Sequence, residues 1–256
     1  MPPSARLPGG RTVSLEPDAV RPGSLVLRID GSEQSLIDPA DPGALDLEYT
    51  ARLGAVVDAV APAAQPVRVL HLGAGALSLA RYTASSRPAS EQTVVELEEG
   101  LVEFVLAHAP LPSGARLRVI TGDASAVLPS GSFDLVVLDA YDGDEIPAAF
   151  YRAEVLAGIA ERVGDGLLAV NVADDADHRR LDRLRGEVGR LLPVTAAVGA
   201  ASFVEHRSGG NAILLASLGS VAADVAIALL RAGPHPVAAA AQRDVVPVEV
   251  PVEVDP

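Results

Sequence analysis

The chain has 256 residues, a formal net charge of −14 and a hydrophobic content of 49%, which indicates a globular protein with one main core. It contains no Cys, and all 20 of its basic residues are Arg, so a thiol nucleophile, a Schiff-base lysine and a Walker-type lysine are excluded. The negative charge and an aromatic content of 3% argue against a nucleic acid partner. No apolar segment approaches the length of a membrane span, so we expect a cytoplasmic protein without membrane contact.

The N-terminal region, residues 1–46, is rich in Pro, Gly and Asp and contains short β-like runs at 11–15 and 24–29. We predict that it forms a small antiparallel cap. Residues 45–60 have the apolar spacing of a helix, which Pro62 ends.

Predicted strands and helices then alternate along the chain. The strands are expected at 67–72, 93–97, 117–121, 135–138 and 167–172, and the helices at 77–84, 100–107, 148–161 and 177–192. This alternation is typical of an α/β fold with a doubly wound, mostly parallel sheet. We assign a seven-stranded sheet of this kind to residues 47–219.

The end of the chain has a different pattern. Segments 196–205 and 211–217 flank a turn at 207–210 and predict an antiparallel hairpin on the edge of the sheet. Residues 220–256 are expected to form a helix, 221–230, followed by a tail of Pro, Val and Glu. The alternating prolines favour disorder in that tail over an edge strand.

Three features in the first half of the predicted sheet point to a nucleoside site. The first strand runs into a tight turn containing Gly73 and Gly75, where missing side chains let a ligand approach the backbone. The second strand ends in Glu96, at the spacing from this turn where an acid commonly accepts hydrogen bonds from ribose hydroxyls. A third strand is followed by Gly122, Asp123 and Ala124, and the aspartate could accept from an adenine amino group. Each feature also has a purely structural explanation, as a turn residue or a helix-terminal charge.

The fourth strand, 135–138, ends in a cluster of acids: Asp139, Asp142, Asp144 and Glu145. Because ligands of parallel sheets lie beyond the carboxyl ends of the strands, these side chains predict a small cationic substrate. The alternative is that they solvate a loop or cap the next helix. His71 lies within a predicted strand, and we interpret it as a packed core residue.

The order of these motifs resembles the spermidine/spermine synthase (polyamine aminopropyltransferase) family, which has the class I S-adenosylmethionine-dependent methyltransferase-like fold. The similarity covers roughly residues 30 to 217. The matching segments are Asp30-Gly31-Ser32-Glu33-Gln34, Tyr49, Val94-Val95-Glu96-Leu97-Glu98 and Asp139-Ala140-Tyr141-Asp142.

The resemblance implies roles for these residues. Glu96 would hold ribose, Asp123 adenine, and the catalytic Asp139 and Asp142 the amines, while Gln34, Tyr49 and Tyr141 would contact the substrate. It also implies decarboxylated S-adenosylmethionine as the donor and a homodimer, and we expect no metal. The chain departs from the family pattern at four positions, where it has Ala76, Thr50, Ala51 and Gly143.

Three functions stay open at this point. The first is aminopropyl transfer to an amine such as putrescine, with release of methylthioadenosine. The second is methyl transfer from intact S-adenosylmethionine to a small molecule, in which Asp139, Asp142 and Asp144 could ligate Mg²⁺ with help from Asp174 or Asp175. The third is a non-catalytic nucleoside-binding protein, which the four departures from the family pattern suggest.

Overall fold

The computed structural model describes residues 1–143 and 145–241. Its N-terminal part is a four-stranded antiparallel sheet of β1 (Ser4–Arg6), β2 (Thr12–Pro17), β3 (Leu25–Ile29) and β4 (Ser32–Ile37), in that order. Asp30 and Gly31, both with positive φ, form the tight turn between β3 and β4. This confirms the predicted antiparallel cap. The prediction missed β4, because that strand begins with three exposed polar residues and lacks a clear apolar alternation.

The main sheet has eight strands in the described part of the chain. They are β5 (Arg68–Leu72), β6 (Glu91–Glu96), β7 (Arg116–Thr121), β8 (Leu135–Leu138), β9 (Leu167–Asp174), β10 (Val194–Ala200), β11 (Gly210–Ser217) and β12 (Val237–Ala241). Their order is β12-β10-β11-β9-β8-β5-β6-β7, in which β5 to β9 run parallel to one another and β10 to β12 pair antiparallel. The predicted fold class is confirmed, with one strand more than expected.

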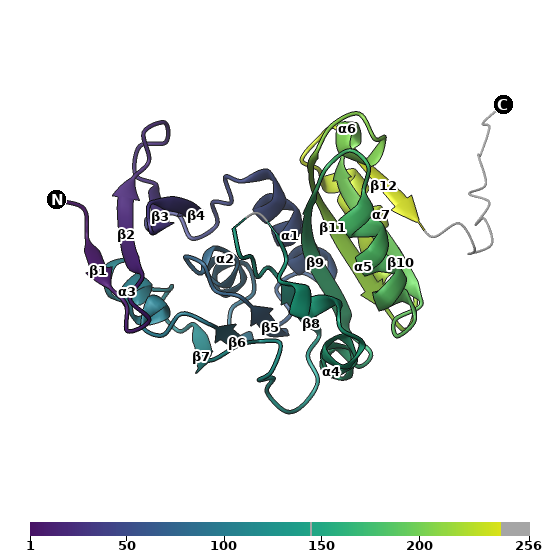
Figure 1. Cartoon of the computed structure of the whole chain (residues 1–256), viewed down its shortest axis with the longest axis horizontal. Helices are drawn as coiled ribbons and strands as arrows, with labels where there is room; N and C mark the ends of the chain where they lie inside the picture. Colours follow the sequence, from purple (N-terminus) through teal and green to yellow (C-terminus); the bar gives the residue numbers. More distant parts are fainter. Residues whose placement is uncertain (144, 242–256) are drawn as a thin grey trace.

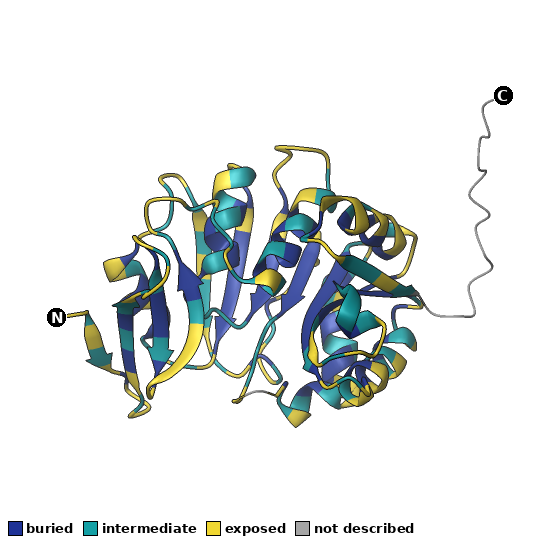
Figure 2. Ribbon diagram, turned by 90° about the horizontal axis from the view of Figure 1, so that it is seen from above, coloured by how far each residue is buried: buried dark blue, intermediate teal, exposed yellow. Residues whose placement is uncertain are grey.

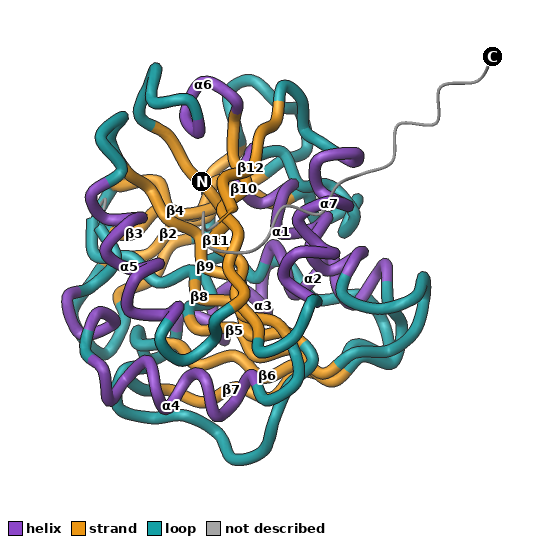
Figure 3. The backbone as a smooth tube through the Cα atoms, turned by 90° about the vertical axis from the view of Figure 1, so that its right-hand side faces the viewer, coloured by secondary structure: helices purple, strands orange, loops and turns teal. Residues whose placement is uncertain are grey.

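Helices cover both faces of this sheet. They are α1 (Glu48–Ala59), α2 (Ser78–Ser86), α3 (Leu101–His108), α4 (Ala153–Val163), α5 (Arg179–Gly189), α6 (Ala201–Val204) and α7 (Val221–Ala232), with a 3-10 turn η1 (Ala148–Tyr151) before α4. Figure 3 shows α4 and α5 on one side of the sheet and α1, α2 and α7 on the other. The central strands β5, β8, β9 and β11 are mostly apolar and buried (Figure 2), as expected for a sheet covered on both faces, whereas the edge strand β7 has no buried residue. Within the described residues, no helix is long and apolar enough to cross a membrane.

Several details differ from the sequence-based expectations. The predicted helix 148–161 is interrupted at Arg152, whose extended backbone separates η1 from α4. The predicted strand 196–205 ends at Ala200 and continues into α6, so the connection to β11 is longer than a tight turn. The pair β10–β11 is not at the edge of the sheet, because β12 pairs with β10. The predicted disordered tail follows the last helix, but its first part forms the edge strand β12, so the prediction of disorder is wrong there; residues 242–256 lie outside the described residues.

Buried arginines hold several loops of the fold. Arg87, just after α2, is 1% exposed and donates five hydrogen bonds, to the carbonyl oxygens of Val57, Asp58, Ala61, Pro62 and Gln65. One guanidinium thus satisfies the free carbonyl groups at the end of α1 and in the loop that follows it. This contact fixes α1 against α2, and both helices lie beside the cavity described next.

Candidate active site

The glycine turn follows β5 and leads into α2, at the carboxyl end of the central parallel strands (Figure 1). Gly73 has φ +100°, and a Cβ at this position would collide with the carbonyl oxygen of Asp139. Gly75 has φ +48°, and a Cβ there would collide with Oγ of Ser35 from the N-terminal sheet. Both glycines are therefore required by the backbone conformation and by close approach. The glycine turn therefore connects the part of the site predicted to bind the nucleoside with the part predicted to bind the amine.

Glu96 is the last residue of β6 and is buried. Its Oε2 accepts a hydrogen bond from the backbone N–H of Ala74 and its Oε1 from that of Glu98, each at 2.8 Å. Burial raises the pKa of Glu96, and the two backbone donors act against that rise. Each carboxylate oxygen keeps a further lone pair, so the group can still accept hydrogen bonds from a diol.

The turn after β7 contains the other residues that we predicted for the nucleoside. Asp123 is exposed and lines the cavity, and its Oδ1 accepts from the N–H of Ser125 at 2.8 Å. Ala124 lines the cavity as well. Gly122 lies behind it and donates its N–H to the carbonyl of Glu96 at 2.8 Å. The turn is thus tied to β6 and leaves Oδ2 of Asp123 available to a ligand.

Asp139 directly follows β8 and is half-buried at the cavity wall. Its Oδ1 accepts from Nδ2 of Asn171 at 2.9 Å, and Oδ1 of Asn171 accepts from Nδ2 of Asn211 at 3.0 Å. Burial raises the pKa of Asp139, and the hydrogen bond from Asn171 lowers it. The sequence analysis missed both asparagines. The available signal was Asn171, a single polar residue inside an apolar strand.

The predicted substrate-contacting residues lie around Asp139. Tyr49 on α1, Gln34 on β4 and Tyr141 all line the cavity. Burial, followed by the negative charge of Asp139, raises the pKa of both tyrosines, so their hydroxyl groups are neutral. The Tyr141 hydroxyl donates to the carbonyl of Asn171 at 2.8 Å and accepts from the N–H of Ala173 at 2.9 Å, which fastens the loop to β9. The Tyr49 hydroxyl makes no hydrogen bond within the described residues and is the free donor of the pair.

Asp142 does not join this group. It is exposed, it is not among the residues that line the cavity, and its N–H donates to the carbonyl of Glu145 at 2.9 Å in a small local bridge. The sequence placed it beside Asp139 because both follow the same strand, but its neighbours Tyr141 and Gly143 line the cavity while Asp142 does not. Asp144 lies outside the described residues.

The magnesium alternative requires Asp139, Asp142 and Asp144 to converge with Asp174 or Asp175. No group of three or more His, Asp or Glu side chains in the described chain is placed to hold a metal ion. Asp174, a suggested ligand, instead accepts hydrogen bonds from the N–H groups of Asp175, Arg180 and Leu181, and so caps the start of α5.

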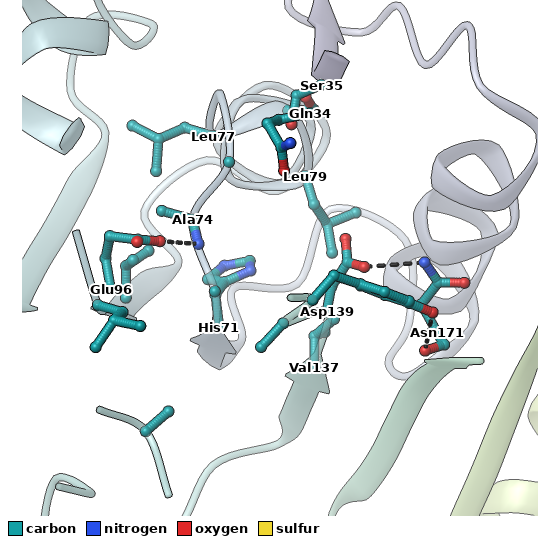
Figure 4. A pocket seen from close by; sticks show the side chains of 18 of the residues that line it. Gln34, Ser35, His71, Ala74, Leu77, Leu79, Glu96, Val137, Asp139 and Asn171 are labelled. Atoms are coloured by element: carbon teal, nitrogen blue, oxygen red, sulfur yellow. Dashed lines mark hydrogen bonds between the residues drawn. The ribbon is translucent and has the colours of Figure 1, made fainter. Parts of the chain in front are cut away.

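One cavity of about 410 Å³ connects the two ends of the site, and both Glu96 and Asp139 line it (Figure 4). This volume lies in the range of small-molecule sites. Five of the described lining residues are acids, namely Glu33, Glu96, Glu98, Asp123 and Asp139. Arg11 is the one cationic side chain among the described lining residues, and it pairs with Glu98 at 3.1 Å and with Asp30 at 2.9 Å. The cavity therefore favours cationic ligands.

No protein-family model matches the chain. Over 123 residues, 45% of the chain, it is 29% identical to the polyamine aminopropyltransferase of Korarchaeum cryptofilum, and the match covers 38% of that relative's length. A probable spermidine synthase from Corynebacterium glutamicum superimposes with a TM-score of 0.78 and 24% identity, over 93% of this chain and 90% of that one. Spermidine synthase from Thermotoga maritima gives a TM-score of 0.60 with 14% identity over 85% and 72%. These likenesses confirm the resemblance and the methyltransferase-like fold that the motifs predicted.

Proposed function

We propose that this chain, which resembles the polyamine aminopropyltransferases in sequence and shares their fold, transfers an aminopropyl group from an adenosyl sulfonium to an amine. The observation that carries the proposal is the single acidic cavity in which Glu96 and Asp139 lie at separate positions. A nucleoside with a cationic tail has the matching distribution of groups.

The nucleoside end of the donor is assigned to the glycine turn and its neighbours. Glu96 accepts from the two ribose hydroxyls with its remaining lone pairs, and Asp123 accepts from the adenine amino group. Gly73 and Gly75 allow the sulfonium end to pass close to the backbone, and Ala124 lies beside the base. None of these contacts needs a phosphate group on the ligand.

The charge of the part of the cavity around Asp139, which we assign to the aminopropyl end of the donor, favours a decarboxylated donor over intact S-adenosylmethionine. A carboxylate on the donor tail would enter a region that contains Asp139, with Glu33 also in the lining, and the one described lining cation, Arg11, is already paired twice. An unpaired carboxylate in such a site loses its hydration without compensation. An aminopropyl tail carries only a positive charge.

Asp139 is the proposed proton acceptor. An amine is protonated at neutral pH and must lose a proton before it can attack the carbon beside the sulfonium. As the new C–N bond forms, the C–S bond breaks and its electron pair stays on sulfur, which gives methylthioadenosine. Burial raises the pKa of Asp139, which makes this carboxylate a better base than an exposed one. Tyr49, Gln34 and Tyr141 hold the reactants in line, which supplies further acceleration.

In this proposal Asp142 does not have the catalytic role that the motif suggests. Because it is exposed and outside the cavity lining, it attracts an approaching amine through its charge and does not accept the proton.

Product analysis tests the proposal. The purified protein is incubated with an amine such as putrescine and either decarboxylated or intact S-adenosylmethionine. Aminopropyl transfer yields methylthioadenosine from the decarboxylated donor, and Asp139→Asn lowers its turnover by about 100-fold or more, whereas the exposed control Asp165→Asn does not. Formation of adenosylhomocysteine would instead identify a methyltransferase. Nucleoside binding without either product would identify a non-catalytic protein.

A further inference from the structure

His71 on β5 is 4% exposed, yet it forms part of the cavity wall. Its Nε2 lies 2.9 Å from Oε1 of Gln92, and Nε2 of Gln92 donates to the carbonyl of Ala80 at 3.1 Å. The bond to Ala80 fixes the Gln92 amide so that its oxygen faces the imidazole. Nε2 of His71 must therefore carry the proton.

The second ring nitrogen, Nδ1, has no hydrogen-bond partner in the described part of the chain. Nδ1 is also not fully enclosed. In the described residues, the fully enclosed side-chain atoms that lack a hydrogen-bond partner are Nε of Arg52 and Oγ of Ser86, and Nδ1 of His71 is not among them. Burial lowers the pKa of His71 to about 4, so the ring is neutral at physiological pH and Nδ1 is a bare acceptor. The cavity is the space from which this acceptor can be reached, and Figure 4 shows the ring in the view between Glu96 and Asp139.

The strand register places His71 farther inside than Asp139. His71 pairs with Val137 of β8, and Asp139 lies two residues beyond Val137 on the same face of the sheet. At about 3.3 Å per residue, the Cα of His71 lies roughly 7 Å deeper along the strand direction than the Cα of Asp139. The wall opposite is formed by Leu53 and Leu79, and by Thr50, whose hydroxyl already donates to the carbonyl of Leu47 at 2.8 Å.

We propose that Nδ1 of His71 accepts a hydrogen bond from a primary ammonium group of the substrate at the inner end of the cavity. This inference rests on the proposed function and deepens it, because it assigns a second recognition point for the aminoalkyl chain. A buried ammonium requires an acceptor in place of the water that it loses. A neutral imidazole supplies one without the repulsion that an imidazolium would cause. Substrates with an ammonium at this distance from the reacting end are favoured over uncharged analogues.

Calorimetry on three proteins tests the inference: the wild type, His71→Leu and the control His108→Leu. His108 is an exposed histidine outside the cavity lining that bonds the Phe104 carbonyl of its own helix. The ligands are methylthioadenosine, decarboxylated S-adenosylmethionine, and 1,4-diaminobutane added with methylthioadenosine. The first lacks an ammonium, the second carries it on the donor and the third on the acceptor.

We expect His71→Leu to weaken at least one of the two ammonium ligands by about tenfold. Methylthioadenosine should bind to all three proteins alike, and His108→Leu should match the wild type throughout. If both ammonium ligands bind His71→Leu as tightly as the wild type, the inference is overturned while the proposed function stands. If neither ammonium ligand binds the wild type, both the proposed function and the inference are overturned.

A second measurement does not depend on the stability of the leucine variant. In protein labelled with ¹⁵N-histidine, the His71 resonances are assigned by their absence in His71→Gln. The inference predicts a neutral ring protonated at Nε2, with an Nδ1 resonance that moves when an ammonium ligand is added and stays in place with methylthioadenosine. The inference would be overturned if Nδ1 already carries a proton, or if its resonance does not move with any ammonium ligand.

Discussion

Asn171 donates a hydrogen bond to Asp139, with 2.9 Å between Nδ2 and Oδ1. The two residues lie side by side because Leu138 of β8 pairs with Val170 of β9, and Asp139 and Asn171 each come one position after this pair. Asn171 is itself held by Asn211 of β11 at 3.0 Å. Amide groups from two further strands therefore fix the orientation of the carboxylate to which we assign proton acceptance.

Replacing Asn171 by Leu should shift the pH dependence of turnover. The hydrogen bond from Asn171 lowers the pKa of Asp139, so its loss raises that pKa, and the carboxylate becomes protonated at higher pH. Because the reaction needs the ionised form, the acidic limb of the pH profile should move to higher pH. The measurement is kcat/KM against pH for both proteins. A limb that stays in place would mean that Asn171 does not act through Asp139.

Asp139→Asn should make the protein more stable at neutral pH while it lowers turnover. Burial raises the pKa of Asp139 above its unfolded value, so the ionised carboxylate costs stability above the raised pKa. That cost shrinks as the pH falls through the folded pKa, and it is gone below the unfolded value. The Tm of the variant should thus exceed that of the wild type at neutral pH and converge with it below about pH 4. A variant that is less stable at neutral pH would contradict this electrostatic assignment.

Glu96→Ala should weaken methylthioadenosine binding by about tenfold or more, because it removes the carboxylate that we propose accepts two ribose hydrogen bonds. It also leaves the N–H groups of Ala74 and Glu98 without their carboxylate partner, so the free energy of unfolding should fall. Calorimetry and urea unfolding measure the two effects separately. The exposed Glu99, outside the cavity lining, offers a matched control in Glu99→Ala. Equal affinity in Glu96→Ala and the control would remove Glu96 from the nucleoside site.

Arg87→Leu should destabilise the whole fold by about 3 kcal/mol or more, since five carbonyl groups lose the hydrogen bond from the guanidinium. Urea unfolding checks the value. Arg116→Leu, at an exposed position of the edge strand β7, should change stability by no more than about 0.5 kcal/mol. Similar effects of the two substitutions would show that burial and hydrogen bonding do not distinguish these arginines.

The sequence predicted the parts of the fold that depend on local pattern. The apolar runs of β5 to β9 and the spaced apolar residues of the helices between them specify the alternation of the parallel sheet. β12 was missed because four of its five residues are Ala, which has little strand preference, and its place is set by pairing with β10. The break at Arg152 was missed because apolar spacing continues across it.

The site was predictable where its residues follow strand ends, and less so elsewhere. Glu96 and Asp139 line one cavity because both lie at the carboxyl ends of parallel strands that end at the same edge of the sheet. Asp142 was placed by the same logic, but it is the fourth residue after β8, where the loop conformation decides where a side chain lies, and the sequence does not reveal that conformation. The roles of Asn171 and His71 depend on cross-strand register and on side-chain partners, which only the folded chain brings together.

The relative affinity for two donors tests the central claim most directly. Calorimetry compares decarboxylated with intact S-adenosylmethionine, which differ by one carboxylate. Around Asp139, the described lining of the cavity contains acids and no unpaired cation. The account therefore predicts that the decarboxylated compound binds at least about tenfold more tightly. Equal affinities, or tighter binding of the intact compound, would contradict it.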